Sequence, residues 1–313
     1  MARKIIGPLL LVVAVATITY FIVREDMLGV LLDVEVGLLG WIMLISGIGL
    51  AIRGQQLAVV TRPYGVRFSR GESTGLSALH TLSNYLPGRA GILVRGAYLY
   101  RFHQVSAADY TAVTALWLVG SLLSAVLLGL AVSAVAVQEV HRSLTLMVFG
   151  ASGAALIAGY AALEFIVSRG TGNTRATRWL HRVQRGLRLW REPGVWRAWF
   201  AVWSFGLLLV MALRYWLALT ALGDTSGFAA ALIIQCLVSL SVLVSVTPGN
   251  VGVREGVAAF GAMLTGVDPQ IALLAALIDR AAALVISLIG FVLLGRPLVR
   301  KHREQGSSPG EAA

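Results

Sequence analysis

Residues 271–295 of the chain read IALLAALIDRAAALVISLIGFVLLG, an apolar run interrupted only by the adjacent charges Asp279 and Arg280. About 20 consecutive apolar residues are enough for a helix to cross the hydrocarbon core of a bilayer. The run therefore predicts a membrane-spanning helix. Charged side chains at membrane depth are costly, and their presence by default indicates a functional role.

The composition of the whole chain agrees with a membrane protein. Of its 313 residues, 57% are hydrophobic and only 13% are charged, with a formal net charge of +11; ordinary soluble domains are about a quarter charged. The basic residues lie between apolar runs, the positive-inside pattern of membrane proteins rather than a nucleic-acid-binding surface. Because Cys236 is the only cysteine, a disulfide framework and a cysteine-based metal site are excluded. The five histidines lack metal-ligand spacing, and we expect neither an enzyme nor a cofactor.

Five further runs are long enough to span a bilayer, at residues 5–23, 34–52, 111–137, 144–167 and 198–222. A signal peptide is the alternative for residues 5–23. However, the run is long, and it is followed by Arg24, Glu25 and Asp26 without a small-residue cleavage site. A retained helix is therefore favoured.

Two other apolar stretches are broken near their middles. Residues 75–100 contain Pro87-Gly88, and residues 228–264 contain Pro248-Gly249. Proline removes a helical hydrogen-bond donor and glycine weakens helical order, so each pair should interrupt a helix. Broken backbone at membrane depth survives only where protein or a wet cavity satisfies its polar groups. Each stretch is therefore predicted to be a re-entrant hairpin.

The charges of the loops set the predicted topology. Segment 168–197 holds eight arginines against Glu192 alone, so it should be cytoplasmic, as should residues 53–71 and the basic tail. A single crossing by residues 75–100 would place segment 168–197 outside. We therefore predict an all-α polytopic bundle in the cell membrane, with six spanning helices, two opposed re-entrant helical hairpins and both termini cytoplasmic.

This topology contains an inverted repeat. Residues 34–137 and 198–295 each read span, hairpin, span in opposite orientations, joined by the basic segment 168–197 within an integral membrane domain of residues 1–297. Interrupted helices at matching positions of an inverted repeat indicate a transporter-like binding site. Residues 174–191 are either an interfacial helix on anionic lipid headgroups or a solvated basic loop. The tail, residues 298–313, is expected to be disordered.

The candidate site consists of charges at membrane depth. These charges could neutralise one another, through Arg254 with Glu255 or through Asp279 with a nearby arginine. Arginine is nevertheless in excess, which favours Arg95 and Arg280 as contacts for an anion, because guanidinium matches phosphate in a bidentate manner. Arg214 also lies inside a predicted span, and His80 is expected to be a packed polar group. The charged residues predicted to bind substrate are Arg89, Arg95, Arg254, Glu255, Asp279 and Arg280.

Two motifs carry a resemblance to a known family. The pattern Asn84-x-x-Pro87-Gly88-Arg89-x-Gly91, with Arg95 downstream, resembles the first signature of the lysylphosphatidylglycerol synthase transmembrane-region family. Residues 248–256, PGNVGVREG, followed by Asp279-Arg280, resemble its second. The likeness extends over about residues 5–295 and implies a lipid flippase or flippase-like protein in which Asn84, Arg89, Arg95, Glu255 and Arg280 line the translocation site. Some family members are fused to aminoacyl-lipid synthases or glycosyltransferases. One departure is that Leu118-Val119 stands where relatives often carry an acidic-Arg pair.

The expected function is a flippase-like transporter. Its substrate would be a phospholipid or polyisoprenoid-linked lipid with an anionic or zwitterionic headgroup. The alternatives are a secondary transporter of a small anionic solute and an accessory membrane subunit of a separate lipid-modifying enzyme. Since no nucleotide-binding motif is present, transport would run downhill or on an ion gradient. Expected partners are the lipid substrate, anionic headgroups at the cytoplasmic surface and, for the last alternative, that enzyme.

Overall fold

The computed structural model describes residues 35–85, 90–136, 139–169, 194–244 and 247–295, together with His181 and Gln184. Within these ranges all regular secondary structure is helical, and no strand is present. The long helices are α3 (Val36–Thr61), α6 (Ala107–Ala136), α7 (Glu139–Arg169), α9 (Val195–Ala221) and α12 (Pro269–Leu294). The shorter elements are η1 (Arg62–Tyr64), α4 (Arg70–Ser83), α5 (Ala90–His103), α10 (Phe228–Leu240), η2 (Ser241–Val244), η3 (Pro248–Asn250) and α11 (Val253–Thr265).

The five long helices are the candidate membrane spans of the described residues, each long and apolar enough to cross a bilayer. They coincide with five of the six predicted spans. The sixth, residues 5–23, lies outside the described residues, as do the tail 298–313 and most of the basic segment 168–197, including almost all of residues 174–191.

One predicted boundary is wrong. Residues 53–71 were expected to form a loop, but α3 continues through Arg53 and ends at Thr61. Its last turns carry polar groups that face neighbouring helices. Arg53 contacts the sulfur of Met211 at 3.6 Å, and the buried Gln56 donates to Ser204 at 2.8 Å. Because these groups contact neighbouring helices, the helix can extend beyond its apolar portion.

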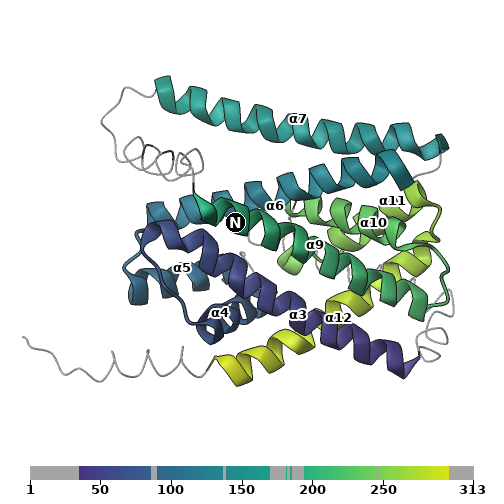
Figure 1. Ribbon diagram of the computed structural model, residues 1–313, viewed down its shortest axis with the longest axis horizontal. Coiled ribbons are helices and arrows are strands. Elements are labelled where there is room, and N and C mark those ends of the chain that lie inside the picture. Colours follow the sequence, from purple (N-terminus) through teal and green to yellow (C-terminus); the bar gives the residue numbers. More distant parts are fainter. Residues whose placement is uncertain are drawn as a thin grey trace, which may run out of the picture.

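Contacts between the long helices fix their relative directions. Ser46 and Gln56 of α3 bond to Arg214 and Ser204 of α9, respectively, so α3 and α9 run antiparallel. By contrast, α12 runs parallel to α3. The middle of α12 lies beside the start of α3, and Gly290, closer to the end of α12, faces Leu50 further along α3. Figure 1 shows α4 and α5 near one end of this bundle and α10 and α11 near the other.

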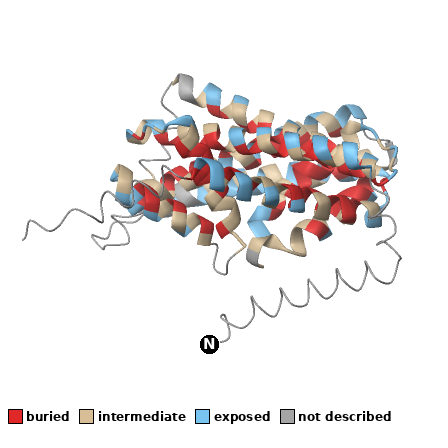
Figure 2. Cartoon of the chain, turned by 90° about the horizontal axis from the view of Figure 1, so that it is seen from below, coloured by how far each residue is buried: buried red, intermediate tan, exposed pale blue. Residues whose placement is uncertain are grey.

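Burial divides the long helices between interior and surface. The core gathers around buried residues such as Tyr215, Ile234 and Leu274, and Figure 2 shows the buried residues concentrated within the bundle. α7 lies along the outside and packs on α6, where Phe149 fills the space beside Gly129. Large apolar side chains on the outer faces are exposed, as expected of a surface that meets lipid; examples are Trp41, Met147, Ile157, Leu288 and Leu293.

Candidate substrate-binding site

The break after α10 is formed by residues with left-handed backbone. Gly249, Asn250 and Gly252 have φ angles of 62°, 57° and 84°, a region that favours glycine and, among other residues, asparagine. α11 then begins at Val253, and a carboxylate oxygen of Glu255 accepts a hydrogen bond from the Gly252 amide at 2.8 Å. The motif Pro-Gly-Asn-Val-Gly therefore separates α10 from α11, as the sequence predicted.

A buried carboxylate joins three helices beside this break. Asp279 of α12 is fully buried and forms ion pairs with Arg214 of α9 and with Arg254 of α11. Arg214 also donates to the hydroxyl of Ser46 at 3.2 Å. Asp279 carries one negative charge and is therefore shared between two guanidinium groups, the buried Arg214 and the partly exposed Arg254.

A second ion pair lies next to the first. Arg280 and Glu255 approach to 2.7 Å with side chains only 9% and 2% exposed. The Arg280 guanidinium also donates to the carbonyl oxygens of Gly249 and Asn250 at 3.2 and 3.3 Å. These hydrogen bonds link the backbone of the break to α12. We call the five residues Arg214, Arg254, Glu255, Asp279 and Arg280 the paired cluster.

The pairing differs from the simplest sequence interpretation. That interpretation placed Arg254 against Glu255, but adjacent residues on a helix do not face each other. Arg254 instead reaches Asp279, and Glu255 reaches Arg280. The alternative pairing, Asp279 with a nearby arginine, is the one in the structure, and Arg280 is occupied within the protein.

The two interrupted stretches meet directly. The Gly249 amide donates to the Asn84 carbonyl at 2.9 Å, and the Arg280 guanidinium lies 5.7 Å from the centre of the Tyr85 ring. Asn84 ends α4, with its side-chain amide 3.1 Å from the imidazole of His80. A Cβ on Gly91 would collide with the Asn84 side chain, so the glycine of the first motif permits close packing. Arg89 lies outside the described residues.

Arg95 of α5 has a different environment. Its side chain is buried, the residue being 8% exposed, and the Nε atom has no hydrogen-bond partner. Among the described residues no carboxylate lies within ion-pair distance of its guanidinium. The guanidinium instead lies 5.9 Å from the centre of the Trp117 ring, where the π face provides modest cation stabilisation.

A polar chain extends from this ring across the bundle. The Trp117 indole donates to Gln56 at 2.9 Å, and Gln56 donates to Ser204. Trp117, Gln56 and the ring of Tyr85 were not predicted. Trp117 directly precedes Leu118-Val119, the two positions where relatives often carry an acidic-Arg pair. Gln56 was missed because residues 53–71 were expected to form a loop.

The comparisons with known proteins agree with the two motifs. Residues 4–290 match the family model described as Lysylphosphatidylglycerol synthase TM region. The chain belongs to this family. The comparison with curated proteins gives no match. The protein is thus a multi-pass member of the family. Both sequence motifs lie where its interrupted helices meet, apart from residues 86–89, which are not described. Within the described part, no group of three or more His, Cys, Asp or Glu side chains could hold a metal ion.

Proposed function

We propose that this protein is a non-enzymatic, flippase-like transporter of a phospholipid or polyisoprenoid-linked lipid, and that Arg95 contacts its anionic or zwitterionic headgroup. In this proposal the membrane domain has six spans, counting residues 5–23, and α4–α5 and α10–α11 are opposed re-entrant hairpins of an inverted repeat. Both termini are cytoplasmic.

The directions of the helices support the opposed hairpins. α4 begins where α3 ends, and its Gly75 packs against the backbone of Leu294 at the end of the parallel helix α12. α10 and α11 instead connect the end of α9 with the start of α12. The two hairpins therefore enter from opposite ends of the bundle and meet at the bond between Gly249 and Asn84. Each of their helices has 13 or 14 residues, fewer than a bilayer crossing needs.

The observation that supports the function is the charge of Arg95, which no carboxylate of the described residues compensates. A buried cation without a counter-charge is unfavourable, so the site gains stability from an anion. The phosphate of a lipid headgroup matches the planar guanidinium. A charge-assisted hydrogen bond of this kind contributes about 1.5–3 kcal/mol, or roughly a tenfold to hundredfold change in affinity.

An apolar groove supports a lipid rather than a soluble anion. It has a volume of about 380 Å³ between α3 and α12 and is lined by side chains such as Leu39, Met43, Ile278 and Val285. Val285 also belongs to the exposed apolar surface, so the groove is continuous with the face that meets lipid. A solute carrier does not need such a groove, whereas a lipid transporter can use it for an acyl or isoprenoid tail.

The direct test is leaflet-resolved translocation in proteoliposomes. Fluorescent phosphatidylglycerol, phosphatidylethanolamine and a polyprenyl phosphate are each placed in one leaflet, and the fraction reaching the other leaflet is followed by membrane-impermeant quenching. We expect protein-dependent movement of at least one of these lipids above protein-free vesicles. Uptake of inorganic phosphate without movement of any lipid would support the solute-carrier alternative.

The proposed topology has its own test. In a Cys236→Ser background, Arg67→Cys probes the α3–α4 connection and Thr225→Cys probes the α9–α10 connection, while Arg175→Cys probes the basic segment. Membrane-impermeant maleimide applied to intact cells should label position 225 alone. Labelling of position 67 or 175 from outside would contradict the proposed orientation.

A further inference from the structure

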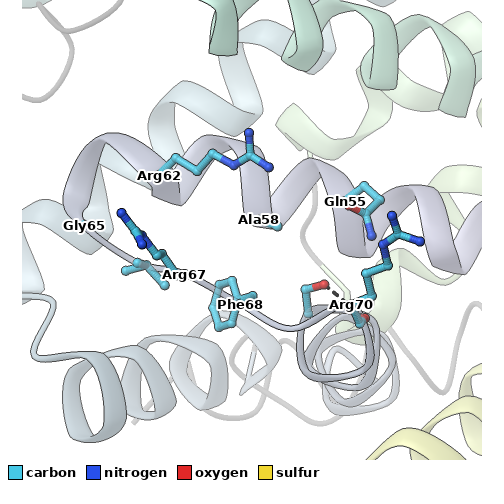
Figure 3. A pocket seen from close by; sticks show the side chains of 9 residues that line it. Gln55, Ala58, Arg62, Gly65, Arg67, Phe68 and Arg70 are labelled. Atoms are coloured by element: carbon cyan, nitrogen blue, oxygen red, sulfur yellow. Dashed lines mark hydrogen bonds between the residues drawn. The ribbon is translucent and has the colours of Figure 1, made fainter.

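A basic pocket lies outside both the paired cluster and the Arg95 region. It has a volume of about 690 Å³, and the residues that line it come from the end of α3, the connection that follows, and the start of α4. Figure 3 shows Arg62, Arg67 and Arg70 around this pocket, with Phe68 drawn between Arg67 and Arg70. Its size falls in the range of small-molecule and headgroup sites, about 300–1,000 Å³.

The backbone that presents these arginines is held in place. The chain turns after η1 at Gly65, whose φ of 78° is left-handed, and Val66 is then only 2% exposed. α4 starts with Ser69 as its cap, the hydroxyl accepting from the Glu72 amide at 3.2 Å. The backbone of the pocket is therefore well ordered by local packing, although its arginine side chains are exposed.

The charge of the pocket is not neutralised from within. No acidic residue lines it, and among the described residues no carboxylate lies within ion-pair distance of its three arginines. The nearest acid along the chain, Glu72, is buried and points elsewhere, with one carboxylate oxygen 2.7 Å from the Tyr98 hydroxyl and 3.1 Å from His103. Three guanidinium groups around one cavity can share the oxygens of a single phosphate.

The position of the pocket indicates where that phosphate comes from. The candidate span that begins at Val36 ends at Tyr64, so Arg62 lies in its last turn and Arg67 and Arg70 follow it directly. That is the depth of the headgroups of a bilayer rather than of its hydrocarbon core. A partly buried aromatic side chain, Phe68, stands beside them, as suits a ligand that is polar at one end and apolar at the other.

We infer that this pocket binds the phosphate of an anionic phospholipid headgroup at the membrane surface, as a site separate from Arg95. Binding in this pocket differs from general attraction to an anionic leaflet, because a pocket can be saturated and because the binding depends on Arg62, Arg67 and Arg70. The inference does not rest on the proposed transport function, since Arg95 does not line the pocket and headgroup binding here requires no translocation.

The test measures binding to the purified full-length protein in a zwitterionic detergent, in an Arg95→Gln background that removes the other proposed anion contact. The probes are dioctanoyl phosphatidylglycerol, dioctanoyl phosphatidylcholine, glycerol phosphate and inorganic phosphate, titrated by calorimetry. We expect saturable binding of phosphatidylglycerol, at least tenfold tighter than that of phosphatidylcholine or of either soluble phosphate.

Single substitutions assign the binding to the pocket. Arg67→Gln and Arg70→Gln should each weaken phosphatidylglycerol binding by about tenfold, and Arg70→Lys should weaken it less because the charge is retained. Arg101→Gln, which removes one charge from an exposed position on α5, is the matched control and should change binding less than twofold. Equal effects of the pocket and control substitutions would overturn the site, as would the absence of saturable binding. If glycerol phosphate or inorganic phosphate bound as tightly as the lipid, the assignment to a lipid would be wrong.

Discussion

The arginines near the two interrupted helices have different partners, although Arg95, Arg214 and Arg280 are buried to a similar degree. Arg214, Arg254 and Arg280 share two carboxylates and hold α9, α11 and α12 together. Arg95, on the other side of the meeting point, has an aromatic ring and no carboxylate among the described residues. The first arrangement has the properties of a structural ion-pair network, whereas the second is the one that we propose to contact a substrate. Burial of an arginine alone therefore does not identify a binding residue.

The largest effect is expected at Asp279, because two arginines depend on it. Asp279→Asn removes the counter-charge of Arg214 and Arg254 together, and breaking a buried ion pair from one side costs about 3–5 kcal/mol. We expect little monodisperse protein and a strongly lowered Tm in detergent. Asp224→Asn is the matched control, since that carboxylate lies in a loop and accepts a hydrogen bond from the Ser226 amide. A Tm as high as that of the control would mean that the paired cluster does not hold the bundle.

The next largest effect is expected at Arg280. Arg280→Gln leaves Glu255 without its cation and removes the bonds to the Gly249 and Asn250 carbonyls, so we expect a loss of about 3 kcal/mol in folding free energy. The double substitution Arg280→Gln with Glu255→Gln should recover part of this loss, since neither charge is then left unpaired. The measurement is the Tm of each variant in the same detergent. No recovery in the double variant would mean that the two charges do not interact.

A smaller effect is expected where the two hairpins touch. Gly249 has a φ of 62°, and a Cβ placed there would lie 2.8 Å from a carbon of the Tyr85 ring. Gly249→Ala should therefore lower the folding free energy by about 1–3 kcal/mol through backbone strain and this contact. Gly256→Ala, at a position with open space around it, should leave the Tm unchanged or raise it. Equal Tm values for the two variants would argue against contact between the hairpins in the membrane.

Much of the fold could be predicted from the sequence because hydropathy is a local property. The five described spans fall close to their predicted positions, and Pro248-Gly249 marks a break that backbone chemistry alone requires. The end of α3 was misjudged because Arg53 and Gln56 read as a polar loop. Their partners, Met211 and Ser204, lie about 150 positions further along the chain.

The site was harder to predict than the fold. Its charged residues stand out from the apolar sequence, but the pairs among them do not. Arg214 and Asp279 are 65 residues apart, and Arg254 bonds across helices rather than to its neighbour Glu255. The sequence placed Arg95 and Arg280 together as candidate anion contacts. Only the packing of α12 against the second break distinguishes the paired Arg280 from Arg95.

The most direct test of this distinction compares Arg95→Gln, Arg95→Lys and the wild type in the same proteoliposomes, normalised to inserted protein. Because Arg95 forms no ion pair within the described part of the chain, Arg95→Gln should insert normally and change the Tm little. We predict that it reduces headgroup translocation roughly tenfold to hundredfold, and that Arg95→Lys, which keeps the charge but not the planar fork, retains an intermediate rate. Normal translocation by Arg95→Gln would contradict the account, and so would a failure to insert comparable to that of Asp279→Asn.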